Sequence, residues 1–145
     1  MPRPLPWRLD RAAYPHMQTV QTRFQDMDVL GHINNVAFLS LFETARTKFN
    51  HELELWGRKF GGRRAVVASQ EIHYLAEGSY PEDVEVATGI GHVGGRSWSI
   101  LSAMFQGGRA IAMCDVVIVM AKGEDGDRMP DAFRTRLEEF KVREA

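Results

Sequence analysis

One stretch of the chain repeats hydrophobic residues every three or four positions, the spacing of an α-helix with a single buried face. Its apolar stripe consists of Phe38, Phe42, Ala45, Phe49, Leu53 and Trp56. Asn34 or Asn35 can cap the start of this helix, and Gly57 can end it. The pattern therefore predicts one long helix lying against a large apolar surface.

Elsewhere, apolar and polar residues alternate with the period of two that is typical of β-strands. A short strand is predicted ahead of the helix, over Thr19–Phe24. Four β-rich runs follow the helix, over Ala65–Leu75, Val84–His92, Ser97–Gln106 and Arg109–Ala121. The pairs Gly94-Gly95 and Gly107-Gly108 are turn signals that join the last three runs into an antiparallel meander.

The chain is expected to end in a short helix that starts near Pro130, with Phe133, Leu137 and Phe140 on one face. One long helix against one antiparallel sheet is an α+β layout. The strands are apolar on both faces, and we expect association between subunits to cover the second face. Because prolines crowd the first 16 residues, the prediction is an irregular arm over residues 1–17 and a single domain over residues 18–145.

Composition narrows the range of functions. A chain of 145 residues is the size of one domain, and its net charge of −1 argues against a nucleic-acid-coating protein. The first 16 residues lack the apolar core of a secretory signal, and no apolar run is long enough to cross a membrane, so the expected location is the cytoplasm. Cys114, the single cysteine, excludes an intramolecular disulfide and is expected to be buried.

Chemically capable side chains gather where the first strand meets the helix: Asp26, Asp28, His32 and Asn35. The unpaired N–H groups at a helix start can stabilise an oxyanion, and a nearby aspartate can act as general base or nucleophile. Gly31 would let the backbone approach a ligand closely. This combination suits acyl transfer. The alternative is that these residues only form turns and cap the helix.

The string RFQDMDVLGHINNVAFLSLFETAR resembles the signature of hotdog-fold thioesterases of the 4-hydroxybenzoyl-CoA thioesterase-like family. That signature is an Asp-x-Asp-x-x-Gly-His-x-Asn-Asn loop that runs into a helix with a Glu and an Arg. The matching residues are Asp26, Asp28, Gly31, His32, Asn34, Asn35, Glu43 and Arg46. The resemblance extends through EIHYLAEGSYPEDVEVATGIGHVGGRSWSILSAMF and covers about Thr19 to Ala121.

The resemblance implies a hotdog fold, in which a five-stranded antiparallel sheet wraps around the long helix, with a short C-terminal helix added. It also implies a homodimer or homotetramer with active sites at the subunit interface. The substrate would be an acyl-CoA or an acyl-carrier-protein thioester, with no cofactor beyond the coenzyme A of the substrate. Asp28 would be the catalytic carboxylate, either activating water or attacking the thioester, and the amides near Asn35 would polarise the carbonyl.

The roles of the remaining site residues follow from the resemblance and from their chemistry. Asp26 is expected to fix the loop, whereas His32 either takes part in acid–base chemistry or only pins the loop. Glu43 is a reserve candidate for the carboxylate and is spaced for an ion pair with Arg46. Substrate-binding candidates are Gly31, Asn34 and Arg96, with Arg63 and Arg64 as further contacts for coenzyme A phosphates. His73 and His92 have no ligand spacing, so no metal site is predicted.

Two other functions remain open at this point. Hydratases and dehydratases share the fold, but they use a histidine with an acidic residue to move protons at carbon, and their signatures differ from GHINN. A non-catalytic module that binds acyl-CoA is the other alternative. Release of free thiol separates both from a thioesterase. The identity of the acyl group is not readable, because Phe38, Tyr74 and Trp98 could line a pocket or fill the core.

Overall fold

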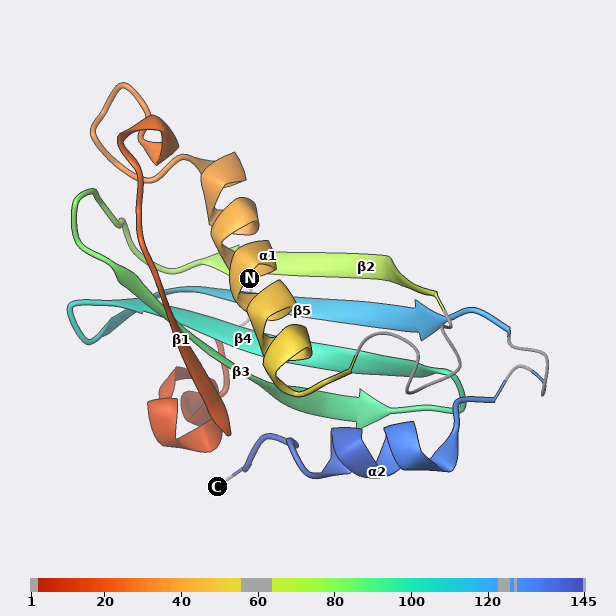
Figure 1. Ribbon diagram of the computed structural model, residues 1–145. Coiled ribbons are helices and arrows are strands. Elements are labelled where there is room, and N and C mark those ends of the chain that lie inside the picture. The colour runs from red at the N-terminus through yellow and green to blue at the C-terminus, as the bar shows by residue number, and fades with distance from the viewer. Residues whose placement is uncertain (1–2, 56–63, 123–125, 127, 145) are drawn as a thin grey trace.

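The computed structural model describes residues 3–55, 64–122, 126 and 128–144, which form one antiparallel sheet, one long helix and a short C-terminal helix (Figure 1). The sheet has five strands in the order β1-β3-β4-β5-β2. The strands are β1 (His16–Val20), β2 (Ala65–Tyr74), β3 (Val84–Val93), β4 (Ser97–Gln106) and β5 (Arg109–Met120). The helices are α1 (Asn35–Glu52) and α2 (Asp131–Glu138). This is the predicted order of elements, and the predicted meander from β3 to β5 is confirmed.

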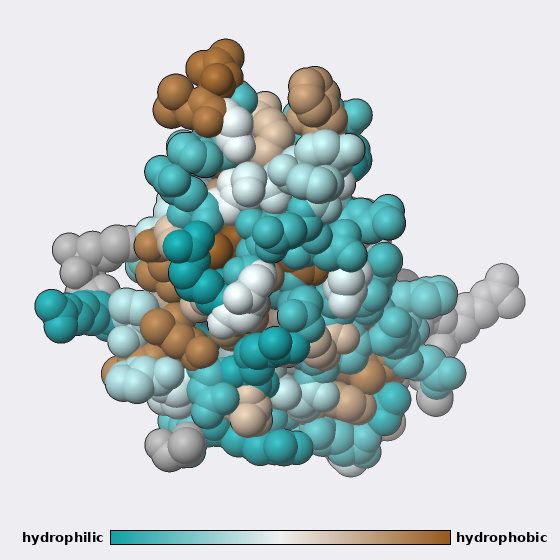
Figure 2. Space-filling model, turned by 90° about the vertical axis from the view of Figure 1, so that its left-hand side faces the viewer, coloured by the Kyte–Doolittle hydropathy of each residue, from teal (hydrophilic) through white to brown (hydrophobic). Residues whose placement is uncertain are grey.

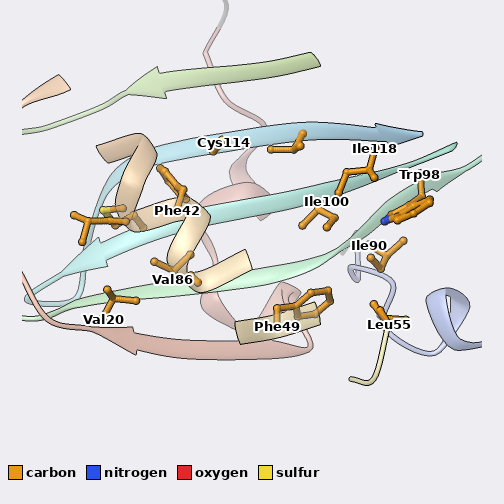
Figure 3. Packing of buried hydrophobic residues seen from close by; sticks show 14 of the residues in the cluster. Val20, Phe42, Phe49, Leu55, Val86, Ile90, Trp98, Ile100, Cys114 and Ile118 are labelled. Atoms are coloured by element: carbon orange, nitrogen blue, oxygen red, sulfur yellow. The ribbon is translucent and has the colours of Figure 1, made fainter. Parts of the chain in front are cut away.

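Helix α1 crosses the concave face of the sheet, as the sequence pattern predicted (Figure 1). The described stripe residues Phe38, Phe42, Ala45, Phe49 and Leu53 are all buried. Figure 3 shows Phe42 and Phe49 over the strands that carry Val86, Ile90 and Ile100. Trp56 and Gly57, the predicted last stripe residue and helix end, lie outside the described residues. No helix in the described part of the chain is long and apolar enough to span a membrane.

The first strand differs from the prediction. The expected strand was Thr19–Phe24, but β1 spans His16–Val20, in register from His16 against Thr88 to Val20 against Val84. Val84 is the first residue of β3, so β1 has no partner beyond Val20 and the chain leaves the sheet. Phe24 instead begins a short 3₁₀ turn and is exposed.

The N-terminal arm is more ordered than its prolines suggested. It contains two short 3₁₀ helices, Pro6–Leu9 and Arg11–Ala13, and the sheet begins at His16, within the predicted arm. The arm packs on the sheet face opposite α1. There a second apolar cluster is formed by Ala13, Tyr14, Ala87, Ala103, Phe105 and Met113. The chain's own arm therefore covers part of the face for which cover by another subunit was expected, and association between subunits stays a prediction.

A buried arginine ties the arm to this outer face. The Arg8 guanidinium donates to both carboxylate oxygens of Asp115 on β5, at 3.1 and 2.6 Å, and to the Tyr14 hydroxyl at 2.9 Å. Burial disfavours the charged form of Arg8, but the hydrogen bonds to Asp115 and Tyr14 outweigh burial and raise its pKa. The Tyr14 pKa is also raised, chiefly by burial. The contacts make a local anchor of several charge-assisted hydrogen bonds.

Candidate active site

The loop between the Phe24–Asp26 turn and α1 folds back on itself through Asp28. The Asp28 N–H donates to the His32 carbonyl at 2.8 Å, and the Gly31 N–H donates to the Asp28 carbonyl at 3.1 Å. Gly31 makes this reversal possible with φ at +82°, a left-handed conformation that favours glycine. The substrate-binding role of Gly31 stays a prediction, and the backbone shows in addition that the turn itself favours glycine here.

The Asp28 carboxylate has one oxygen committed to the loop and one that is available. Its Oδ1 accepts from the Leu30 N–H at 2.9 Å and from the His32 N–H at 3.1 Å. Within the described residues, Oδ2 makes no hydrogen bond, and the residue is half-exposed. The loop therefore orients the carboxylate through one oxygen and leaves the other for chemistry.

Helix α1 starts immediately after this loop, with Asn34 as its cap. The Asn34 side chain accepts from the Val36 N–H at 2.8 Å, and the Asn34 carbonyl accepts from the Phe38 N–H at 3.1 Å. In the part of the chain that the structure describes, the N–H groups of Asn35 and Ala37 have no acceptor. Two backbone donors at the positive end of the helix are thus available for an oxyanion.

Asp26 occupies a different environment from Asp28, although only Met27 separates them. Its carboxylate is buried and accepts from the Arg23 N–H at 2.8 Å and from the Arg23 guanidinium at 2.8 Å. The hydrogen bond from the Arg23 guanidinium to Asp26 raises the pKa of Arg23. The Asp26 carbonyl also accepts from the Asn34 N–H at 2.8 Å, which joins the two ends of the loop. Both carboxylate oxygens and the carbonyl of Asp26 therefore accept hydrogen bonds that hold the loop.

A second segment, residues 74–80, packs against this loop, a contact that the sequence did not predict. The Glu77 carboxylate lies 3.1 Å from Nε2 of His32, and the Gly78 carbonyl accepts from the Ile33 N–H at 2.8 Å. The Tyr74 hydroxyl donates to the Asn35 carbonyl at 3.1 Å, at the helix start. Local sequence patterns do not predict these contacts, because the contacting residues are about 40 positions apart in the chain.

The three aromatic residues that could line a pocket or fill the core differ in burial. Phe38 and Trp98 are core residues, whereas Tyr74 stays partly exposed.

Arg96 and Arg64, two of the three arginines predicted to contact coenzyme A phosphates, do not lie at the loop. Arg96 lies in the β3–β4 turn, where its carbonyl accepts from the Met120 N–H at 2.8 Å. The Asp28 loop lies at the other end of the sheet, beside Gly78 and the β4–β5 turn (Figure 1). Arg64 is exposed just before β2, and Arg63 lies outside the described residues. Binding of coenzyme A phosphates by these arginines stays a prediction.

Glu43 points away from the protein interior. Its carboxylate is exposed and lies 3.8 Å from the Arg46 guanidinium, so the predicted ion pair along α1 is present.

The histidine of β2 has a carboxylate partner: Nε2 of His73 lies 2.6 Å from the Glu71 carboxylate. Among the described residues, no group of three or more His, Cys, Asp or Glu side chains is arranged to hold a metal ion.

Comparisons with known proteins identify the class of protein that has this fold and this loop. Three solved structures match most of the chain: a Pseudomonas aeruginosa protein, a predicted thioesterase from Bacillus stearothermophilus, and a Thermus thermophilus thioesterase complexed with coenzyme A and zinc. Identities are 26, 28 and 29%, and TM-scores are 0.78, 0.76 and 0.74. The alignments cover 91, 89 and 88% of this chain and 95, 98 and 95% of the other chains. No curated protein matches at the sequence level.

The fold and these relatives define a thioester hydrolase with a hotdog fold, as the sequence resemblance implied. The family model of the thioesterase-like superfamily matches residues 22–137. The chain therefore belongs to the thioesterase-like superfamily.

Proposed function

We propose that this protein hydrolyses an acyl-CoA or acyl-carrier-protein thioester to the free acid and the thiol, with Asp28 as the catalytic carboxylate. One observation carries the proposal. The uncommitted Oδ2 of Asp28 and the two unpaired N–H groups of α1 belong to one loop-and-helix unit. A carboxylate and oxyanion donors are the two components that acyl transfer requires.

The chemistry has two possible courses through the same carboxylate. As a general base, Asp28 takes a proton from water while the water oxygen bonds to the thioester carbon. As a nucleophile, Oδ2 bonds to that carbon itself and forms an anhydride, which water then hydrolyses. In both courses the carbonyl oxygen gains negative charge near the N–H groups of Asn35 and Ala37. The C–S bond then breaks, and the leaving sulfur takes the proton held by Asp28 in the general-base course or a proton from solvent water in the nucleophile course.

Coenzyme A is the preferred carrier in this proposal. The support is the Thermus thermophilus relative, which was crystallised with coenzyme A. A panel of short, long and aromatic acyl-CoAs, with matched acyl-carrier-protein thioesters, would identify carrier and acyl group by the rate of thiol release. Hydration of an enoyl-CoA, or binding of acyl-CoA without thiol release across the panel, would contradict the proposal.

The substitution Asp28→Asn tests the catalytic carboxylate. The asparagine keeps an Oδ1 that can accept from Leu30 and His32, so the loop should persist while the negative charge is lost. We expect kcat to fall by about 10²–10⁴-fold, the usual range for loss of an acid–base group. Glu43→Gln is the matched control and should retain activity. If Glu43→Gln were inactive and Asp28→Asn active, the catalytic carboxylate would be Glu43.

We further propose that two copies of the chain associate with the active sites at their interface. The support is exposed apolar surface: Val29, Leu30 and Val36 flank the site, and Val66 and Val67 lie on the edge strand β2. Figure 2 shows hydrophobic residues projecting at the top of the molecule, where the loop lies. Such exposed apolar surface is typical of subunit contacts.

The oligomer proposal is tested by charging the edge of β2. The double substitution Val66→Lys and Val67→Lys should give monomers in light scattering and should reduce thiol release. Leu5→Lys is the control, because Leu5 is exposed to a similar degree (61%, against 52% and 50%) but lies on the arm. A double variant with an unchanged mass would place the interface elsewhere.

A further inference from the structure

One histidine–carboxylate pair at the site, His32 and Glu77, takes no part in either course of the reaction at Asp28. We propose that Glu77 is a positioning residue for His32: it binds Nε2 and leaves Nδ1 as the ring nitrogen available to the reacting groups. This inference rests on the proposed hydrolase function of the Asp28 loop. It assigns a role to Glu77, which lies outside the signature loop, and it decides between the two roles that the sequence left open for His32.

The backbone of His32 is held on both sides. Its N–H donates to Asp28 Oδ1 at 3.1 Å, and its carbonyl accepts from the Asp28 N–H at 2.8 Å. The next residue, Ile33, is buried and donates to the Gly78 carbonyl at 2.8 Å. Only the side-chain torsions of His32 therefore remain to be set. A partner for the imidazole ring therefore sets the orientation of the His32 side chain.

The backbone of Glu77 is held as well. Its carbonyl accepts from the Arg109 guanidinium at 2.9 Å. The following residue, Gly78, packs so tightly that a Cβ atom there would lie 2.8 Å from Cδ1 of both Ile33 and Ile111. Because Ile33 directly follows His32 and Gly78 directly follows Glu77, the two ion-paired residues are attached to backbones in contact. Exposed ion pairs are weak largely because flexible side chains must be ordered, and this arrangement lowers that cost.

The ion pair has a chemical consequence for the ring. A neutral imidazole carries its proton on one nitrogen, and a neighbouring carboxylate favours the proton on the nitrogen that it contacts. The Glu77 carboxylate lies 3.1 Å from Nε2, so its negative charge favours the proton on Nε2. Nδ1 makes no hydrogen bond to the described residues and can accept one from a water or from the thiol that the reaction releases. Glu77 thereby acts on the reaction only through His32.

The chain offers a matched control for this pair. Glu71 and His73 form a second histidine–carboxylate pair, at 2.6 Å, with a glutamate as exposed as Glu77 (71% against 73%). That pair lies along β2, outside the Asp28 loop. The substitutions Glu77→Gln and Glu71→Gln therefore remove the same charge from two histidine–glutamate pairs, of which only the His73–Glu71 contact is also a hydrogen bond. Only the first is expected to affect catalysis.

The experiment measures thiol release from the best acyl-thioester of the panel. Glu77→Gln should lower kcat by about five- to tenfold with KM nearly unchanged, a size within the range for directly interacting neighbours. Glu77→Asp should recover part of the loss, and Glu71→Gln should match the unsubstituted protein. In a His32→Gln background, Glu77→Gln should add no further loss. Nitrogen NMR of the unsubstituted protein should report a proton on Nε2 of His32, and Glu77→Gln should shift the ring toward a mixture of tautomers.

Full activity of Glu77→Gln, or an undiminished effect of Glu77→Gln in the His32→Gln background, would overturn the inference. So would full activity of His32→Gln, which would mean that the histidine only pins the loop. Failure of the proposed function looks different, because the unsubstituted protein would then release no thiol from any substrate. In that case the NMR measurement still tests whether Glu77 sets the tautomer of His32.

Discussion

At the scale of single residues, burial decides what each polar group can do. Asp26 is buried and hydrogen-bonded to Arg23, so its carboxylate serves the loop, whereas Asp28 keeps one free oxygen. Cys114 is an extreme case: it lies in the core on β5, and burial raises the pKa of its thiol to about 11. A thiol with such a pKa stays protonated near neutral pH and is a poor nucleophile.

The raised pKa of Cys114 predicts a loss of stability in alkali. The pKa of the Cys114 thiol is higher in the folded protein, about 11, than its ordinary value of 9.0. The protonated thiol therefore makes its full contribution to the free energy of unfolding below pH 9, and this contribution declines as pH rises toward 11. A shift of two units corresponds to at most about 3 kcal/mol. Urea unfolding from pH 8 to pH 11 measures the decline in the free energy of unfolding. Cys114→Ala, less stable at the outset, should decline less steeply over this range; parallel curves would contradict the prediction.

At the scale of elements, the start of α1 links stability to the site. The helix is held at its first turn by the Asn34 side chain, by the bond from the Asn34 N–H to the Asp26 carbonyl, and by the Tyr74 hydroxyl on the Asn35 carbonyl. The same turn presents the N–H groups of the proposed oxyanion site. Fixing these donors in advance avoids reorganisation during the reaction, which is the main source of their catalytic effect.

Removal of the cap tests this link. Asn34→Ala leaves the Val36 N–H without its acceptor and should lower the free energy of unfolding by about 1 kcal/mol, as for other helix caps. It should also lower kcat, because the first turn would fray. Ser40→Ala, at an exposed position further along α1, is the control and should change neither quantity. Equal stability of the two variants would show that the cap is dispensable.

At the scale of the whole molecule, the sheet has two apolar faces that are covered differently. Helix α1 covers one face, and the arm covers part of the other through the Arg8 anchor and the cluster around Phe105. The C-terminal tail pairs with the edge of β3 next to the start of β1, where the Ile90 N–H donates to the Phe140 carbonyl at 2.8 Å. Both ends of the chain thus complete the sheet.

The anchor formed by Arg8 predicts that substituting Arg8 lowers the free energy of unfolding far more than substituting Arg11, another arginine of the arm. Arg8→Ala leaves the partly buried Asp115 without its partner and removes one of the two hydrogen bonds of the Tyr14 hydroxyl, and should cost about 2–3 kcal/mol of unfolding free energy. Arg11 forms an exposed ion pair with Glu85, so Arg11→Ala should cost less than about 1 kcal/mol. Urea denaturation of both variants makes the comparison. Similar costs would mean that the arm contributes little to the fold.

The order of elements could be predicted from the sequence because hydrophobic periodicity is a local property. The stripe from Phe38 to Leu53 and the double-glycine turns specified α1 and the meander, and the end of β4 at Gln106 was predicted correctly. The boundary of β1 was not, because a strand ends where its partner ends and Val84 is 64 residues beyond Val20. The buried position of Cys114 was also predictable from its apolar run.

For the candidate site, the sequence by itself identified the Asp26–Asn35 loop, its junction with a helix and the family that carries such a loop. Only the tertiary structure separated the environments of the two aspartates and brought Glu77 to His32. It also showed that the chain's own arm lies on the outer face of the sheet. The physical reason is range: turns and caps are decided by neighbouring residues, whereas burial and ion pairing depend on segments that meet only after folding.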